Sequence, residues 1–192
     1  MTQRCFVWAA WIASAAATLL LALPLVARAA ATPADGLPKV SLTDQNGKTI
    51  SLASLKGKPA LVAFIHTQCE GPCELITAEM KSVARNLGPR FKSEVTMVLI
   101  TTEPNEDGSR ELLAYAKKQG VNADGWLFLT GAPAEIRRLL ALYGVAAEDD
   151  KSDHVLELFL LSADGAGVRR YSGVAAPPQA IASDIRKTAS LH

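Results

Sequence analysis

The alternation of short apolar runs with amphipathic stretches constrains the fold of this chain more than any other feature of its sequence. Residues 60–65 form a continuous apolar run of strand length, and residues 95–101 repeat that pattern. Such runs are expected for strands that are buried on both faces of a sheet. Between them, residues 74–87 carry apolar side chains at helical spacing, namely Ile76, Met80, Val83 and Leu87. A strand, a helix and a second strand in this order predict an α/β fold.

The flanking segments extend this alternation in both directions. Residues 39–43 and 48–52 are predicted to be two short strands around Asn46-Gly47, a dipeptide typical of β-hairpin turns. The remaining predictions are a helix capped by Ser109 and ended by Gly120, a strand at 126–129, a helix opened by Pro133 and closed by Gly144, strands at 155–161 and 168–171, and a last helix from Pro177-Pro178 to about 188. The order predicts one domain over residues 39–192, a sandwich of helices around a mixed sheet.

The N-terminal residues differ in composition from this domain. Arg4 and Arg28 are the only charged residues before position 31, and an apolar stretch at 6–26 lies between them. Residues 1–29 are therefore predicted to be a secretory signal with an Ala-rich cleavage site, followed by a linker at 30–38. An uncleaved segment of this length would instead anchor the protein in the inner membrane. In both cases the domain is expected to be periplasmic or otherwise exported.

Charge and cysteine content narrow the function classes. The chain has 20 basic and 19 acidic residues and a formal net charge of +1, without a long run of either sign, which argues against nucleic acid as a partner. Removal of residues 1–29 also removes Cys5, so the exported chain retains only Cys69 and Cys73. Two close cysteines in an oxidising compartment call for an explanation in thiol chemistry.

The two cysteines lie between a predicted buried strand and a predicted helix, where a helix N-terminus favours thiolates. Their spacing corresponds to about one helical turn if the helix begins early enough, so they could bind Cu(I) together or form a disulfide. A structural disulfide and a zinc site are weaker alternatives, because the loop is short and no fourth zinc ligand is evident. A third copper ligand would have to be a histidine: His66, His154 or His192.

The chain resembles the SCO/SenC family over about residues 40–190. That family consists of thioredoxin-fold copper proteins that serve cytochrome c oxidase assembly. The resemblance depends on segments distributed along the chain: residues 42–48, residues 55–59 with the strand that follows, the cysteine pair, Glu103-Pro104, and Asp153-His154 before an apolar strand that ends in 163–165.

The resemblance implies a thioredoxin-like three-layer sandwich and a copper site formed by Cys69, Cys73 and His154. It further implies a metallochaperone that binds Cu(I), or Cu(II) with an added ligand, and passes copper to a cuproenzyme subunit such as one of cytochrome c oxidase, or to another copper carrier. Delivery by ligand exchange requires no turnover, so a protein with this function is not an enzyme in the strict sense.

The cysteine loop departs from the family pattern and leaves a second function open. Glu70 and Glu74 follow the cysteines where the family commonly has proline, and these carboxylates are expected to raise the thiol pKa values. The tripeptide at 71–73 instead resembles the end of a thioredoxin Cys-Gly-Pro-Cys site. The alternative function is therefore a thiol–disulfide oxidoreductase, in which Cys69 and Cys73 form the redox pair and exchange with a partner protein.

Overall fold

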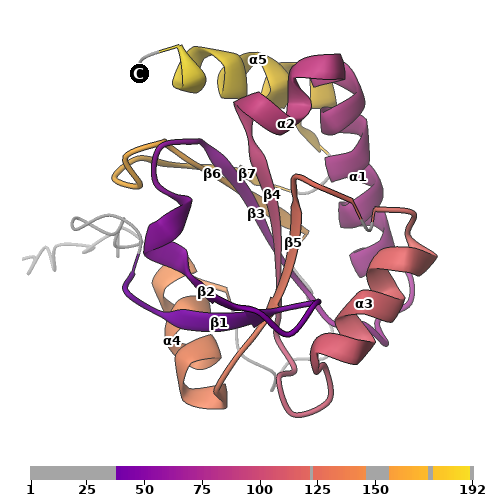
Figure 1. The fold of residues 1–192 in the computed structure, drawn as a ribbon. Coiled ribbons are helices and arrows are strands. Elements are labelled where there is room, and N and C mark those ends of the chain that lie inside the picture. The colour runs from indigo at the N-terminus through magenta and orange to yellow at the C-terminus, as the bar shows by residue number, and fades with distance from the viewer. Residues whose placement is uncertain (1–37, 122, 146–155, 173–174, 191–192) are drawn as a thin grey trace, which may run out of the picture.

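The computed structural model describes residues 38–121, 123–145, 156–172 and 175–190, and its centre is one seven-stranded sheet (Figure 1). The strand order is β2-β1-β5-β4-β3-β6-β7. The strands are β1 (Ser41–Asp44), β2 (Thr49–Ser51), β3 (Ala60–Ile65), β4 (Thr96–Thr101), β5 (Trp126–Thr130), β6 (Glu157–Leu161) and β7 (Val168–Ser172). This is the mixed sheet that the sequence predicts.

Helices cover both faces of the sheet and complete three layers (Figure 1). One face carries α1 (Pro72–Leu87), the short α2 (Phe91–Glu94), α3 (Ser109–Lys118) and α5 (Pro178–Ala189). The other face carries α4 (Pro133–Tyr143) and the 3-10 turn η1 (Leu52–Leu55). A second 3-10 turn, η2 (Gly88–Arg90), connects α1 to α2. The three-layer α/β sandwich is therefore confirmed.

The strand directions explain why the sheet is mixed. The strands β3, β4 and β5 are parallel neighbours, and α1 and α3 connect them across the same face. The strand β6 pairs with β3 in the antiparallel sense, and β7 then pairs with β6 in the same sense. At the opposite side, β1 pairs antiparallel with both β2 and β5, with Ser41 opposite Ser51.

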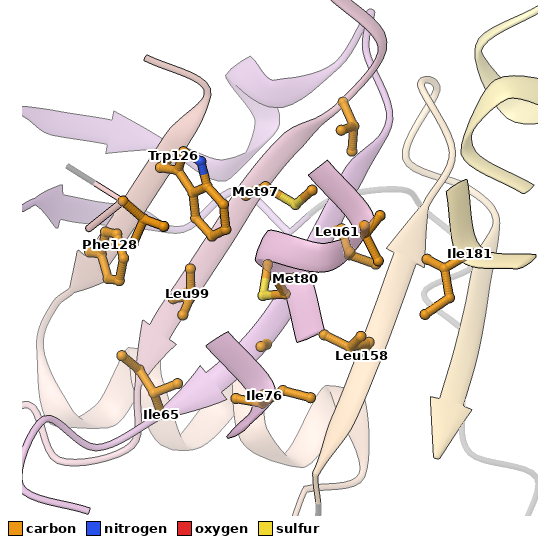
Figure 2. Close-up of a cluster of buried hydrophobic side chains, with 14 of the residues drawn as sticks. Leu61, Ile65, Ile76, Met80, Met97, Leu99, Trp126, Phe128, Leu158 and Ile181 are labelled. Carbon is orange, nitrogen blue, oxygen red and sulfur yellow. The ribbon is translucent and has the colours of Figure 1, made fainter. Parts of the chain in front are cut away.

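The larger hydrophobic core lies between the sheet and the helices α1, α3 and α5 (Figure 2). Met80 and Ile76 of α1 are buried against Leu99 of β4, which is 0% exposed. Trp126 and Phe128 extend this core to β5, where their rings stack with 6.5 Å between the centroids. The buried face of α1 therefore holds the helix that follows the cysteine loop in a fixed position over the sheet.

Two helix boundaries differ from the sequence prediction. The helix α1 begins at Pro72 rather than at residue 74, because proline is accommodated at the first helical position, where no amide donor is needed. Gly108, rather than Ser109, precedes the first turn of α3. The Ser109 hydroxyl donates a hydrogen bond of 2.7 Å to the carbonyl of Asp44 and so connects α3 to β1. Ser109 was expected to act as a cap, but this tertiary bond uses its hydroxyl instead.

Several predictions fall on residues outside the described ones. They include the signal or anchor at 1–29, most of the linker at 30–38, and His154 and His192. Within the residues that the structure describes, none of the helices has the length and apolar character needed to cross a membrane.

The core predicts a clear difference between buried and exposed leucines. Leu99→Ala should lower the free energy of unfolding by about 2–5 kcal/mol, because it leaves a cavity in a strand that is buried on both faces. Leu75→Ala is the matched control: Leu75 is 46% exposed, and the change should stay within about 0.5 kcal/mol. Urea denaturation of the two variants and the wild type measures both values, and equal losses would contradict this description of the core.

Candidate functional site

The cysteine loop joins the carboxyl end of β3 to the beginning of α1. Cys69 lies in the loop and is half-buried, whereas Cys73 lies in the first turn of α1 and is only 4% exposed. Gly71 takes the left-handed conformation, with φ of 92°, which a residue with a Cβ rarely adopts, and Pro72 then starts the helix. The local sequence thus turns the chain sharply between the two cysteines.

The two thiols are free and lie next to each other. The helix begins at Pro72, after Cys69, so the condition under which both cysteines would share one helical turn is not met. A backbone hydrogen bond of 3.1 Å from the Cys69 N–H to the His66 carbonyl folds the loop back instead. In that conformation the Cys69 side chain lies close enough to Cys73 to raise the pKa of the Cys73 thiol. The loop geometry, rather than the helix, brings the pair together.

The thiol of Cys73 is strongly held in its protonated form. The pKa of Cys73 is raised to about 12, mainly because the thiol is buried, and the neighbouring Cys69 and the negative charge of Asp107 act in the same direction. One contact opposes this trend, because the backbone N–H of His66 donates to the Cys73 sulfur at 3.4 Å. Cys73 is therefore a buried thiol that needs a strong electrophile or a bound cation before it gives up its proton.

Glu70 and Glu74 are not the cause of this high pKa. The Glu74 carboxylate forms an ion pair of 2.9 Å with Lys118 of α3, and that lysine lowers the pKa of Glu74. Burial makes the largest contribution to the raised pKa of Cys73, and the carboxylate that contributes is Asp107. The sequence predicts the direction of the shift correctly for Cys73 but assigns it to the wrong residues, because it does not show that Lys118 neutralises Glu74.

The backbone of Cys73 is held in place from inside the core. The hydroxyls of Thr77 and Tyr115 each lie 2.8 Å from the Cys73 carbonyl oxygen and 2.9 Å from each other. Tyr115 comes from α3, so this contact connects the first turn of α1 to the neighbouring helix. Burial raises the pKa of Tyr115, which keeps its hydroxyl available as a donor. The position of Cys73 thus depends on both helices.

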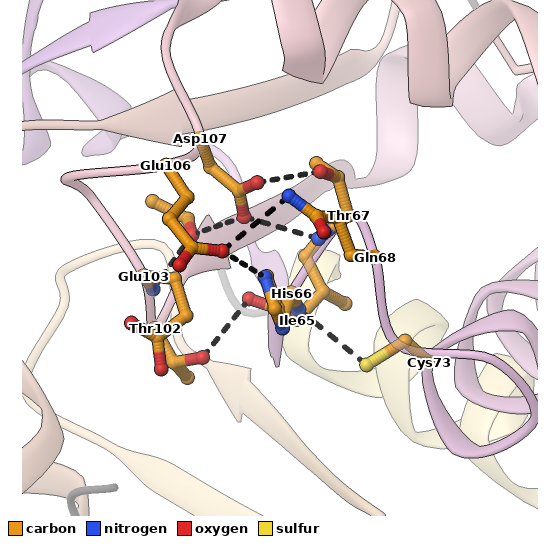
Figure 3. Close-up of polar contacts among 10 residues, drawn as sticks. Ile65, His66, Thr67, Gln68, Cys73, Thr102, Glu103, Glu106 and Asp107 are labelled. Carbon is orange, nitrogen blue, oxygen red and sulfur yellow. Dashed lines mark hydrogen bonds and ion pairs between the residues drawn. The ribbon is translucent and has the colours of Figure 1, made fainter.

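A polar network connects the cysteine loop to the loop after β4 (Figure 3). Asp107 is 0% exposed and accepts hydrogen bonds from the Thr67 backbone, the Thr67 hydroxyl and the Thr101 hydroxyl. Asp107 is not among the residues that the sequence pattern singles out. Its available signal was weak: a threonine at the end of a buried strand with a carboxylate six residues later.

The imidazole of His66 points toward Glu106 in the loop after β4 (Figure 3). Its Nε2 atom lies 3.2 Å from a Glu106 carboxylate oxygen, and the Gln68 amide lies 3.4 Å from the same oxygen. Only the backbone N–H of His66 contacts the Cys73 sulfur. In this conformation the His66 imidazole is therefore engaged as a hydrogen-bond partner of Glu106 and not as a third ligand beside Cys73.

The structure brings together two of the three expected copper ligands, Cys69 and Cys73. The third, His154, lies outside the described residues, as does His192. Within the described part of the chain, no three His, Cys, Asp or Glu side chains converge as a metal site. The two adjacent thiols still match the soft ligands that Cu(I) prefers.

Comparison with known proteins identifies the family of this chain. The model of the SCO1/SenC family matches residues 29–190. The chain belongs to the SCO1/SenC family. It is 30% identical over 155 residues to the SCO1 protein homolog of Bacillus subtilis, which covers 77% of this chain and 80% of that protein. The resemblance inferred from the sequence is thereby confirmed.

Solved structures of this family share the fold. The copper-bound ScoI of Bradyrhizobium japonicum is 29% identical, with a TM-score of 0.64 over 77% of this chain and 96% of that chain. BsSco, described as a member of the Sco family of cytochrome c oxidase assembly proteins with a disulfide switch, is 28% identical, with a TM-score of 0.70 over 84% of this chain and 98% of that chain. The thioredoxin-like architecture of this SCO1/SenC protein is thus confirmed.

The two thiols should react at very different rates. At pH 8, iodoacetamide should modify Cys69 first, because Cys73 is buried and its pKa of about 12 leaves almost no thiolate. Modification of Cys73 should become fast only as the pH approaches 12. Peptide mass spectrometry of initial rates measures both sites, and urea-unfolded protein is the control in which the two rates converge. Similar rates in the folded protein would contradict the burial of Cys73.

Proposed function

We propose that this SCO1/SenC protein is an exported metallochaperone that binds copper through Cys69, Cys73 and His154 and delivers it to a cuproenzyme such as cytochrome c oxidase or to another copper carrier. The observation that carries the proposal is the pair of free, adjacent thiols at the end of β3. Thiolates are soft ligands that select Cu(I), and an imidazole completes a three-coordinate site.

The accessibility of the two thiols supports a site from which copper is released to an acceptor, rather than one that holds copper permanently. Cys69 is half-buried at the surface, whereas Cys73 packs in the core below it. An acceptor protein can therefore reach copper from the Cys69 side and replace the ligands one at a time. Such an exchange keeps the metal bound throughout, which is what a carrier requires.

The strand β6 supports His154 as the third ligand. Because β6 runs antiparallel to β3, with Phe159 opposite Val62, it begins at the edge of the sheet where the cysteine loop begins. Leu156 and Cys69 both pack against the same core cluster. His154 precedes Leu156 by only two residues in the sequence, and we therefore include it among the proposed ligands.

Export supports the same function. Reduced, metal-binding thiols in an oxidising compartment need copper or a reductant to persist, and residues 1–29 have the composition of a secretory signal. We infer that residues 30–38 connect this segment to the domain at 39–192, and that residues 6–26 would hold the protein at the inner membrane if the signal is retained.

A thiol–disulfide oxidoreductase is the second candidate, favoured by the unequal exposure of Cys69 and Cys73. The Cys69 thiolate would attack a partner disulfide and release one partner thiolate. Cys73 would then lose its proton and attack the Cys69 sulfur, which releases the second partner thiolate. The pair is oxidised by two electrons and the partner is reduced by two. The disulfide switch described for BsSco supports this candidate as well.

An anaerobic Cu(I) titration of the reduced protein against a competing chelator tests the proposed copper site. We expect one tightly bound equivalent, and His154→Ala should weaken binding by more than about 100-fold, since losing even an outer-shell partner costs up to about 100-fold. His66→Ala is the matched control, because the His66 imidazole faces Glu106, and it should change the affinity little.

The same variants separate the two candidate functions. His154→Ala should leave disulfide exchange with glutathione nearly intact, whereas Cys69→Ser should abolish both activities. Equal copper binding by His154→Ala and the wild type would overturn the proposed ligand set. Weak binding by the wild type itself, together with rapid exchange, would make the oxidoreductase the main function.

A further inference from the structure

Asp107 is an unusual residue to find at the base of the thiol site. Its carboxylate is fully buried, with 0% of the residue exposed, and the contacts that the structure gives it are hydrogen bonds from neutral donors. Burial of a charge is unfavourable unless hydrogen bonds and local dipoles replace the lost water. Asp107 lies just before the N-terminus of α3, whose free amides favour a negative charge there.

The hydrogen bonds of Asp107 hold one particular point of the cysteine loop. Its Oδ2 atom accepts from the Thr67 backbone N–H at 3.0 Å, and its Oδ1 atom accepts from the Thr67 hydroxyl at 2.5 Å. Thr67 is therefore held at both its backbone and its side chain. Because Cys69 follows two residues later, the direction in which the chain leaves Thr67 sets where the Cys69 sulfur lies.

Asp107 is also hydrogen-bonded to the sheet, through Thr101. The Thr101 hydroxyl, at the end of β4, donates to Asp107 Oδ2 at 2.6 Å and accepts from the Glu103 backbone N–H at 2.9 Å. Thr101 pairs with Ile65 at the end of β3, and the Thr102 N–H donates to the Ile65 carbonyl at 2.8 Å. Asp107 thus connects the cysteine loop to the ends of the paired strands β3 and β4 (Figure 3).

We propose that Asp107 is a positioning residue that, through Thr67, holds the Cys69 thiol against the Cys73 thiol in the metal-free protein. The inference rests on the proposed function, because it assigns the pre-organisation of the same thiol pair. A site that is already assembled does not have to order its ligands when copper or a disulfide partner arrives. We call the Asp107–Thr67–Thr101 contact the loop latch.

The intramolecular disulfide reports this positioning without any metal. Reaction of the reduced pair with glutathione disulfide gives the Cys69–Cys73 disulfide and two glutathione thiols, so electrons and protons balance. The equilibrium constant is the effective concentration of one thiol at the other, and it is high only when the loop holds the two together. Quenching by alkylation followed by mass spectrometry measures the disulfide fraction at each glutathione ratio.

Asp107→Asn should lower this effective concentration about tenfold, because an amide nitrogen replaces one acceptor and opposes a donor of the latch. Thr67→Val should act alike, since valine keeps the volume and loses the hydroxyl, whereas Thr67→Ser should stay within about twofold of the wild type. If Asp107→Asn fails to fold, the Thr67→Val protein tests whether the loop latch holds the two thiols together.

Asp184→Asn is the matched control for a purely structural carboxylate. Asp184 accepts hydrogen bonds from Arg169 and Tyr171 between β7 and α5, away from the cysteine loop. Its loss should lower the melting temperature and leave the glutathione equilibrium unchanged. An equilibrium within twofold of the wild type in both Asp107→Asn and Thr67→Val would overturn the latch. The wild-type copper titration is independent of this result, so failure of the latch and failure of the copper site are distinguishable.

Discussion

The parallel pairing of β3 with β4 is the interaction on which the site depends. The two strands pair over six residues, from Ala60 opposite Thr96 to Ile65 opposite Thr101. Both are apolar and buried on two faces, so a slip of one residue would exchange the side chains of the two cores. In a parallel pair the carboxyl ends meet at one edge, which brings the cysteine loop and the loop that carries Asp107 into contact.

The unequal environments of the two thiols give this site its chemical character. Cys73 is part of the hydrophobic core and keeps its proton, whereas Cys69 lies at the surface of the same cluster. In either proposed function, metal binding or disulfide exchange would begin at the accessible sulfur and involve the buried one second. The copper delivery and the thiol exchange that we propose would both follow this order, so the same pair of thiols is compatible with either function.

Local sequence rules predicted correctly the elements whose formation depends only on neighbouring residues. The apolar run at 60–65 is a buried strand, and Pro133 opens a helix that ends at Gly144 in the left-handed conformation. These rules failed where a distant segment forms a hydrogen bond or an ion pair with the side chain in question. The hydroxyl of Ser109 binds the Asp44 carbonyl rather than its own helix, and Glu74 pairs with Lys118 rather than acting on the thiols. Neither partner is visible from sequence spacing.

The sequence by itself determined the α/β class, the family and the identity of the thiol pair, because hydrophobic periodicity, turn residues and the cysteine spacing are local properties. Only the tertiary structure decided that the His66 imidazole faces Glu106 and that burial raises the pKa of Cys73. It alone showed that Asp107 holds the cysteine loop through Thr67. The physical reason is that these contacts join residues some 40 positions apart or depend on burial, and strand order and helix packing create both.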